Sequence, residues 1–290
     1  MEQIFTANDA ASRTIRTRIS YRAALDKYRS LSRFARVSWT TWLIAVITTA
    51  IWCVSAYQVA LASGAHTLNA VLANILANAV NVQNNDVLAN VLIADGAKYN
   101  PAILQGQYWR FVTPIFLHAN LLHVGLNMLN FVVLGVFIER LVGHLRFLLI
   151  YIVTGVVSII ASFAFMPQEI SVGASGAIFG LVGAYSVFVL VHRRAFRGSG
   201  VAALLWLVFI IGVNLSIGLF VQNVDNYAHV GGLLSGCLLG WWFTPLYRLA
   251  PDGSGKLIDT HSLTRRWPLA LLTITGTMII AIIALHVGGG

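Results

Sequence analysis

The chain has 290 residues, of which 58% are hydrophobic and only 10% charged, and its mean hydropathy is +0.77. Soluble domains carry about 25% charged residues, so this composition excludes an ordinary soluble fold and indicates a polytopic membrane protein. The formal net charge of +9 would suit a nucleic-acid partner, but the basic residues lie in short blocks between apolar runs, as membrane topology requires. We therefore expect a lipid bilayer around the chain and no nucleic acid.

The chain begins with a basic arm, residues 1–37, which holds eight of the 19 Lys and Arg residues. The arm also holds three acidic residues, which are unusual in a mitochondrial presequence, and the apolar run after it is too long for the core of a signal peptide. We interpret it as a cytoplasmic segment on an anionic membrane face. The two cysteines, Cys53 and Cys237, lie in apolar runs without partners at metal-ligand spacing. No metal and no cofactor is therefore expected.

Seven apolar runs are long enough to cross a bilayer as helices, which takes about 20 residues each. They cover residues 38–62, 117–138, 147–166, 173–191, 201–221, 226–246 and 268–287. With a cytoplasmic N-terminus, 17 of the 19 basic residues fall on the cytoplasmic side and only Lys98 and Arg110 fall outside. This asymmetry follows the positive-inside rule and predicts an extracytoplasmic C-terminus. The expected fold is an all-α bundle.

Two connecting segments complete the expected organisation. The long extracytoplasmic loop, residues 63–116, repeats the pattern Leu-Ala-Asn and carries apolar residues on one helical face. An amphipathic helix at the membrane interface is our interpretation, and a disordered tether remains open. Later in the same loop, Trp109-Arg110 alone would be an ordinary interface anchor. Residues 247–267 are read as a cytoplasmic linker to an additional helix, residues 268–290.

The fourth run begins with Gly173-Ala174-Ser175-Gly176, a serine between close glycines. Glycine costs roughly 1 kcal/mol per helical position, so its recurrence on one helical face indicates close packing against another backbone. A second stripe of small residues lies on the sixth run, with His229 beside its first member, and two such stripes let helices approach closely in lipid. We therefore expect His229 to reach hydrogen-bonding range of Ser175. The two stripes are Gly173, Gly176, Gly180 and Gly183, and Ala228, Gly232, Gly236 and Gly240.

The second run contains further polar side chains. His123 and Asn127 are four residues apart and share one helical face, so they can offer two hydrogen-bond donors to one point. His118 is expected to point partly away and to tie down the loop. Polar groups within spans are expensive and usually face a wet cavity or each other. Each of these side chains could also make a structural hydrogen bond between helices. Serine, histidine and paired donors together, however, are what acyl transfer requires.

At these residues the chain resembles the rhomboid family of intramembrane serine proteases. The family pattern is Trp-Arg in the first loop, His-x4-His-x3-Asn on the second helix, Gly-x-Ser-Gly on the fourth and Ala-His-x2-Gly-x3-Gly on the sixth. The resemblance extends from about residue 95 to residue 246. It implies a six-helix protease core, residues 38–246, followed by the additional helix. The matching residues are Trp109, Arg110, His118, His123, Asn127, Gly173, Ser175, Gly176, Ala228, His229, Gly232 and Gly236.

The resemblance also implies roles for two further residues. Phe179 corresponds to the aromatic residue that supports the histidine ring, where tyrosine is common, so a hydroxyl is missing here. Asn226 corresponds to the family residue just before the catalytic histidine. Asp225 lies one turn before His229, and whether it assists remains open, so a Ser-His dyad is the predicted centre. His229 would act as general base, and the oxyanion would be met by His123, Asn127 and the Ser175 N–H.

The expected function is an intramembrane serine endopeptidase that cleaves transmembrane segments of proteins near the extracytoplasmic face. One alternative is an inactive rhomboid-like protein that holds membrane clients, although such relatives typically lose the serine or the histidine. The other is a proton-coupled transporter using His123, His229 and Asp225, which leaves Ser175 unexplained. The helix added at the C-terminal side favours a bacterial plasma membrane, because mitochondrial rhomboids usually add theirs at the N-terminal side.

Overall fold

A computed structural model describes residues 37–80, 86–192, 202, 224–249 and 257–288 of the chain. Its longest elements are apolar helices, and four of them are long and apolar enough to cross a membrane: α2 (Trp39–Ala62), α6 (Leu121–Val142), α7 (His144–Phe165) and α12 (Trp267–Gly288). Two shorter helices, α8 (Ser175–Val191) and α11 (Asn226–Phe243), lie beside α7. The predicted all-α polytopic membrane fold is confirmed.

The predicted spans match these helices closely. Six of the seven runs contain a described helix, and the largest shift is at α6, which begins and ends four residues later than predicted. The later start of α6 has a local cause. The side chain of Asn120 caps this helix by accepting the N–H of His123 at 2.7 Å, and Asn is a preferred N-cap. The predicted run 201–221 lies almost wholly outside the described residues, as does the basic arm.

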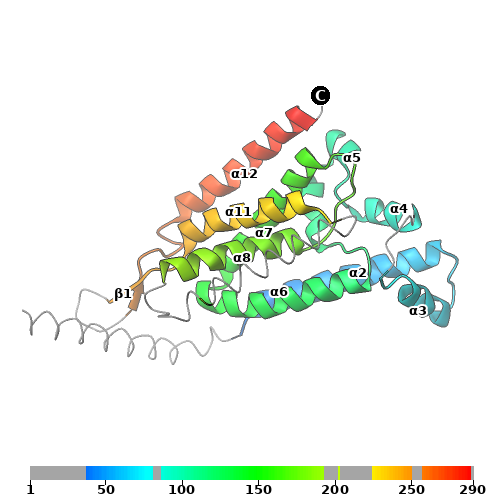
Figure 1. The fold of residues 1–290 in the computed structure, drawn as a ribbon, viewed down its shortest axis with the longest axis horizontal. Coiled ribbons are helices and arrows are strands. Elements are labelled where there is room, and N and C mark those ends of the chain that lie inside the picture. Colours follow the sequence, from blue (N-terminus) through cyan, green and yellow to red (C-terminus); the bar gives the residue numbers. More distant parts are fainter. Residues whose placement is uncertain (1–36, 81–85, 193–201, 203–223, 250–256, 289–290) are drawn as a thin grey trace, which may run out of the picture.

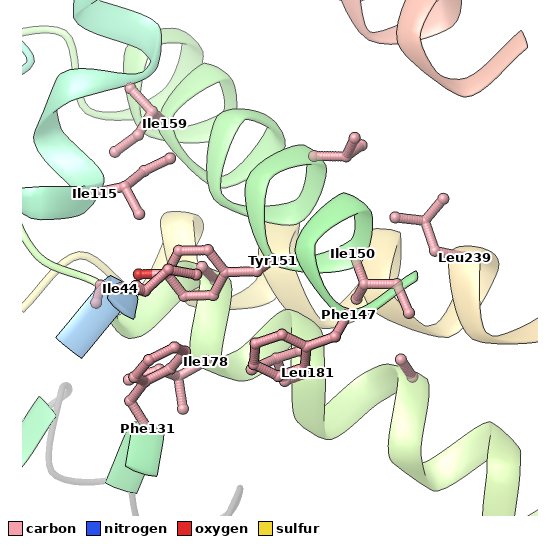
Figure 2. Close-up of a cluster of buried hydrophobic side chains, with 14 of the residues drawn as sticks. Ile44, Ile115, Phe131, Phe147, Ile150, Tyr151, Ile159, Ile178, Leu181 and Leu239 are labelled. Atoms are coloured by element: carbon pink, nitrogen blue, oxygen red, sulfur yellow. The ribbon is translucent and has the colours of Figure 1, made fainter. Parts of the chain in front are cut away.

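Helix α7 forms the centre of the bundle. In the most apolar stretch of α7, 61% of the residues are buried, compared with 11% in that of α12. Helix α12 therefore lies at the periphery. Figure 1 shows α8 and α11 side by side next to α7, with α2 and α6 forming a second layer. Figure 2 shows side chains of α7 meeting those of the neighbouring helices in one apolar cluster. Its labelled members include Phe147, Ile150, Tyr151, Phe131, Leu181 and Leu239.

The long loop after α2 is structured where it is described. It forms α3 (Leu68–Ala77), α4 (Asp86–Asp95), α5 (Asn100–Leu104) and two short 3-10 helices, η2 (Tyr108–Phe111) and η3 (Thr113–Phe116). On α3 the apolar face is divided: Val71 is buried against the end of α2, whereas Leu68 is 74% exposed and Leu76 is 66% exposed. A helix was predicted here, and its placement at the membrane interface stays a prediction.

The linker before α12 contains two short strands. Strands β1 (Tyr247–Leu249) and β2 (Leu257–Asp259) pair antiparallel. Arg146, in the first turn of α7, donates to a carboxylate oxygen of Asp259 at 2.5 Å and so holds the hairpin to the bundle. A two-stranded ribbon has unpaired edges that lipid does not tolerate, and the assignment of this segment as a cytoplasmic linker stays a prediction.

Candidate active site

The Ser175 and His229 side chains meet at one end of the α8–α11 pair. His229 Nε2 lies 2.8 Å from Ser175 Oγ, although the two residues are 54 positions apart in the chain. Ser175 is the first residue of α8, and His229 stands in the first turn of α11. The contact predicted from the two glycine stripes is therefore present in the structure.

Glycine makes this contact possible because the backbones of α8 and α11 touch. A Cβ atom at Gly232 would lie 2.0 Å from the carbonyl oxygen of Gly176, and one at Gly236 would lie 2.0 Å from that of Gly180. Real Cβ atoms do not approach a backbone oxygen this closely, so larger residues would separate the helices. Small polar residues of α7 close the other side: Ser158 and Thr154 occupy the space beside Gly176 and Gly180.

The His229 ring is held by stacking. The Phe179 ring, one turn after Ser175, stacks on it with centroids 4.5 Å apart and planes 20° apart. His229 is 7% exposed, and within the described residues its Nδ1 has no hydrogen-bond partner. Asp225 is instead the N-cap of α11, where its Oδ1 accepts the N–H of Ala228 at 2.9 Å. The described residues therefore form a serine–histidine pair without a carboxylate third member.

The His123 ring borders the same space from α6. A Cβ at Gly173 would lie 2.9 Å from His123 Nε2 and 3.8 Å from Ser175 Oγ, so all three groups surround one point. Gly173 also has φ +130°, a conformation that side-chain-bearing residues rarely adopt. The other ring nitrogen, Nδ1, accepts the N–H of Ala119 at 3.4 Å, which leaves the proton on Nε2, facing Gly173.

The remaining predicted residues lie around this centre. Asn127 is buried on α6, and its amide nitrogen donates to the His123 carbonyl oxygen at 2.9 Å, which leaves its second N–H for another acceptor. His118 is fully within the protein, and its Nε2 accepts the N–H of Ala174 at 3.3 Å, next to the serine. The role expected for His118 is to tie down the loop before α6, and this bond joins that loop to the segment before α8. Asn226 begins α11 beside Asp225.

Trp109 and Arg110 do more than anchor an interface. Arg110 is 5% exposed, and its guanidinium donates to the carbonyl oxygens of Ile93 and Ala97, both at 2.8 Å. The Trp109 ring lies against Gly96, and the Arg110 guanidinium lies 4.6 Å from the centre of that ring. The pair thus organises the loop before α6, which a composition argument about membrane interfaces could not predict.

One residue near the site was missed by the sequence analysis. Lys98 was counted only as a positive charge outside the membrane, yet its side chain is completely buried. Its Nζ donates to the carbonyl oxygens of Met166 and Glu169, in the segment that leads to Ser175. A lone lysine in a loop carries no periodic signal, so only the structure reveals this contact.

Known proteins resemble the part of the chain that contains these residues. The model of the Rhomboid domain matches residues 105–246. The chain is 45% identical over 146 residues to "Rhomboid protease GluP" of Bacillus subtilis, covering 50% of this chain and 28% of that protein. It is 32% identical over 191 residues to "RHOMBOID-like protein 2" of Arabidopsis thaliana, covering 66% and 58%.

A third relative is matched over more of its length. YdcA of Bacillus subtilis, named as a candidate rhomboid protease, is 34% identical over 144 residues, covering 49% of this chain and 71% of YdcA. The chain therefore belongs to the rhomboid family. It nevertheless covers less than two thirds of each of the first relatives, so the match concerns a shared domain and not whole proteins.

Proposed function

We propose that the protein is an intramembrane serine endopeptidase that cleaves transmembrane segments of other proteins with a Ser175–His229 dyad. The observation that carries this proposal is the 2.8 Å contact between His229 Nε2 and Ser175 Oγ, made next to the His123 ring. A serine hydroxyl is a weak nucleophile until a base removes its proton. Membership of a family that includes a relative named a protease supports the same reaction.

The proposed reaction begins when His229 Nε2 takes the proton from Ser175 Oγ as the oxygen attacks a peptide carbonyl carbon. The tetrahedral oxyanion is met by His123 Nε2–H, by the Asn127 amide and by the Ser175 N–H, which has no intrahelical acceptor at a helix start. His229 then gives its proton to the leaving amine and breaks the C–N bond. Water, activated by the same histidine, hydrolyses the acyl-enzyme.

A fluorophosphonate probe tests the nucleophile directly. Wild-type protein in detergent or membranes should be labelled at Ser175 and should cleave a model single-span substrate, and Ser175→Ala and His229→Ala should do neither. Ser186→Ala is the matched control, because Ser186 lies on the same helix and bonds to the carbonyl oxygen of Val182. Equal labelling of wild type and Ser175→Ala, with cleavage intact, would overturn the proposal. A folded wild type that is neither labelled nor active would favour client binding or transport.

Substrate selection follows from the position of Ser175 at the outward end of α8. A transmembrane helix hides its carbonyls in hydrogen bonds, and unwinding it in lipid is costly because freed groups find no water. Preferred substrates should therefore carry Gly, Pro or polar residues near the cleavage point, and a small residue before the bond. A substrate with Gly-Pro there should be cleaved faster than one with Leu-Leu. Equal rates would contradict this part of the proposal.

The proposed orientation places the N-terminus in the cytoplasm and Ser175 near the extracytoplasmic face of a bacterial plasma membrane. In a variant without Cys53 and Cys237, cysteine at Ser63 should react with an impermeant thiol reagent in intact cells. Cysteine at Ser262 should be protected until the cells are broken. Ser63 is exposed and Ser262 is half-buried in the structure. The reverse pattern would invert the orientation.

A further inference from the structure

We infer that Lys98 is a positioning residue for the Ser175 nucleophile: its ammonium group fixes residues 166–174, the segment between α7 and α8. This inference rests on the proposed function and adds a residue outside the motifs that define the site. Lys98 does not touch Ser175. It acts through the segment that ends at the serine.

The first support is the set of atoms that Lys98 holds. Met166 is the C-cap of α7, and its carbonyl oxygen accepts from Lys98 Nζ. The same Nζ donates to the carbonyl oxygen of Glu169 at 2.8 Å. Carbonyl groups at a helix C-terminus lack intrahelical donors and carry partial negative charge, so a cation there satisfies both needs. One side chain thus closes the turn that follows α7.

The backbone of Lys98 continues the same attachment. Its N–H donates to the carbonyl oxygen of Ser171 at 3.0 Å, and the Ser171 N–H donates back to the Lys98 carbonyl oxygen at 3.2 Å. Beyond this bridge, the N–H of Gly173 donates to the carbonyl oxygen of Pro114 at 2.9 Å. The segment is therefore fixed from Met166 to Gly173, and Ser175 follows two residues later. Loss of the Lys98 contacts would release its first half.

The second support is the cost of keeping this cation buried. Lysine is almost never fully buried unless it is paired. Burial lowers the pKa of Lys98 from 10.5 to about 8, while the negative charges of Asp225 and Glu169 act to raise it. A methionine of similar length would avoid the desolvation of a charge. Retaining an ammonium group where its burial is unfavourable points to a role in placing the carbonyls that it binds.

Asp225 extends the argument to the other catalytic helix. It is the N-cap of α11, four residues before His229, and it is the largest favourable charge for the Lys98 ammonium group. Glu169 is the second such charge, from the segment between α7 and α8. Lys98 is therefore electrostatically linked to the start of the helix that carries the base, and bonded to the segment that carries the nucleophile.

The test compares Lys98→Met with Asn100→Leu. Asn100 is the matched control because its amide also attaches the loop to α7, donating to the carbonyl oxygen of Phe163 at 2.9 Å, and Phe163 precedes the segment that Lys98 holds. In full-length protein, the fluorophosphonate labelling rate of Ser175 and the kcat for a single-span substrate should fall at least tenfold in Lys98→Met, with KM changed less than threefold. Asn100→Leu should lower the thermal unfolding midpoint but keep the labelling rate within threefold of wild type.

Two further variants keep the inference open to refutation. Lys98→Arg retains a buried cation with donors and should recover most of the labelling rate. Lys98→Gln retains one donor and replaces Lys98→Met if that variant does not fold.

Labelling of Lys98→Met or Lys98→Gln at the wild-type rate would overturn the inference and leave the proposed protease intact. Parallel loss of rate and stability in both the Lys98 and Asn100 variants would show a purely structural role. A wild type without labelling at Ser175 would instead reject the protease.

Discussion

The two helix pairs that supply the candidate site are joined in different ways. Helices α8 and α11, which carry Ser175 and His229, touch through backbone atoms along a glycine stripe. Helices α2 and α6 meet through side chains, and Glu139 of α6 accepts the first N–H groups of α2, those of Thr40 and Thr41, at 3.1 and 2.8 Å. Ser175 and His229 are thus held by backbone contacts that leave no room for a larger residue, whereas His123 and Asn127 stand on a helix that Glu139 attaches at its far end.

The largest effect is expected from a methyl group between α8 and α11. Gly232→Ala places a Cβ against the Gly176 carbonyl oxygen, and overpacking against backbone costs about 1–3 kcal/mol or more. Labelling of Ser175 should be nearly lost, because the helix separation sets the contact with His229. Gly276→Ala in α12 is the control, since a Cβ there meets nothing within 4 Å. Wild-type labelling by Gly232→Ala would show that the backbone contact is not required.

Substitutions of the polar residues of α6 should lower the reaction rate without disrupting the fold. Asn127→Ala removes one donor from the proposed oxyanion site, which is worth up to roughly 3–4 kcal/mol of barrier, or about 10²–10³ in kcat. The thermal unfolding midpoint should change little, because the hydrogen bond that the amide donates in the described structure is to its own helix. His123→Ala should act similarly, while His118→Ala should mainly lower stability. An unchanged kcat for Asn127→Ala would remove that residue from the oxyanion site.

A smaller effect is expected on the pH dependence of stability, through Lys98. The pKa of Lys98 is about 8 in the folded state and 10.5 when unfolded, so between these values the unfolded state binds more protons and stability rises with pH. At about 1.4 kcal/mol per pKa unit, wild type should gain up to roughly 3 kcal/mol relative to Lys98→Met between pH 8 and 10.5. Denaturant titrations in detergent measure this difference. A constant difference across the window would contradict the shift.

The smallest effect is expected at the far end of α6. Glu139→Gln keeps the shape of the side chain but removes the charge that faces the start of α2 and one of the oxygens that accept from Thr40, Thr41 and His144. Stability should fall by about 1–2 kcal/mol, while kcat should stay near that of wild type. A loss of kcat as large as that of Asn127→Ala would mean that the attachment of α6 controls the site.

The sequence predicted much of the fold because each part of it has a periodic or compositional signal. Apolar runs marked the spans, and glycines at spacings of three and four marked the contact of Ser175 with His229. The exceptions lack such signals. Lys98 and Arg110 are buried by the path of the loop, which charge counting along the chain cannot reveal. The β1–β2 hairpin is too short to show an alternation, and the capping role of Asp225 depends on where α11 begins.

The stacking of Phe179 on His229 has a consequence for the timing of proton transfer. The His229 ring is held by an aromatic face, and within the described structure its Nδ1 makes no hydrogen bond to a carboxylate. In the proposed reaction, no hydrogen-bonded carboxylate would hold the protonated ring, so the proton would pass onward as the leaving amine departs. In the proposed reaction Ser175 would therefore lose its proton only when a peptide carbonyl is held against it, which would protect the surrounding membrane proteins from unselective cleavage.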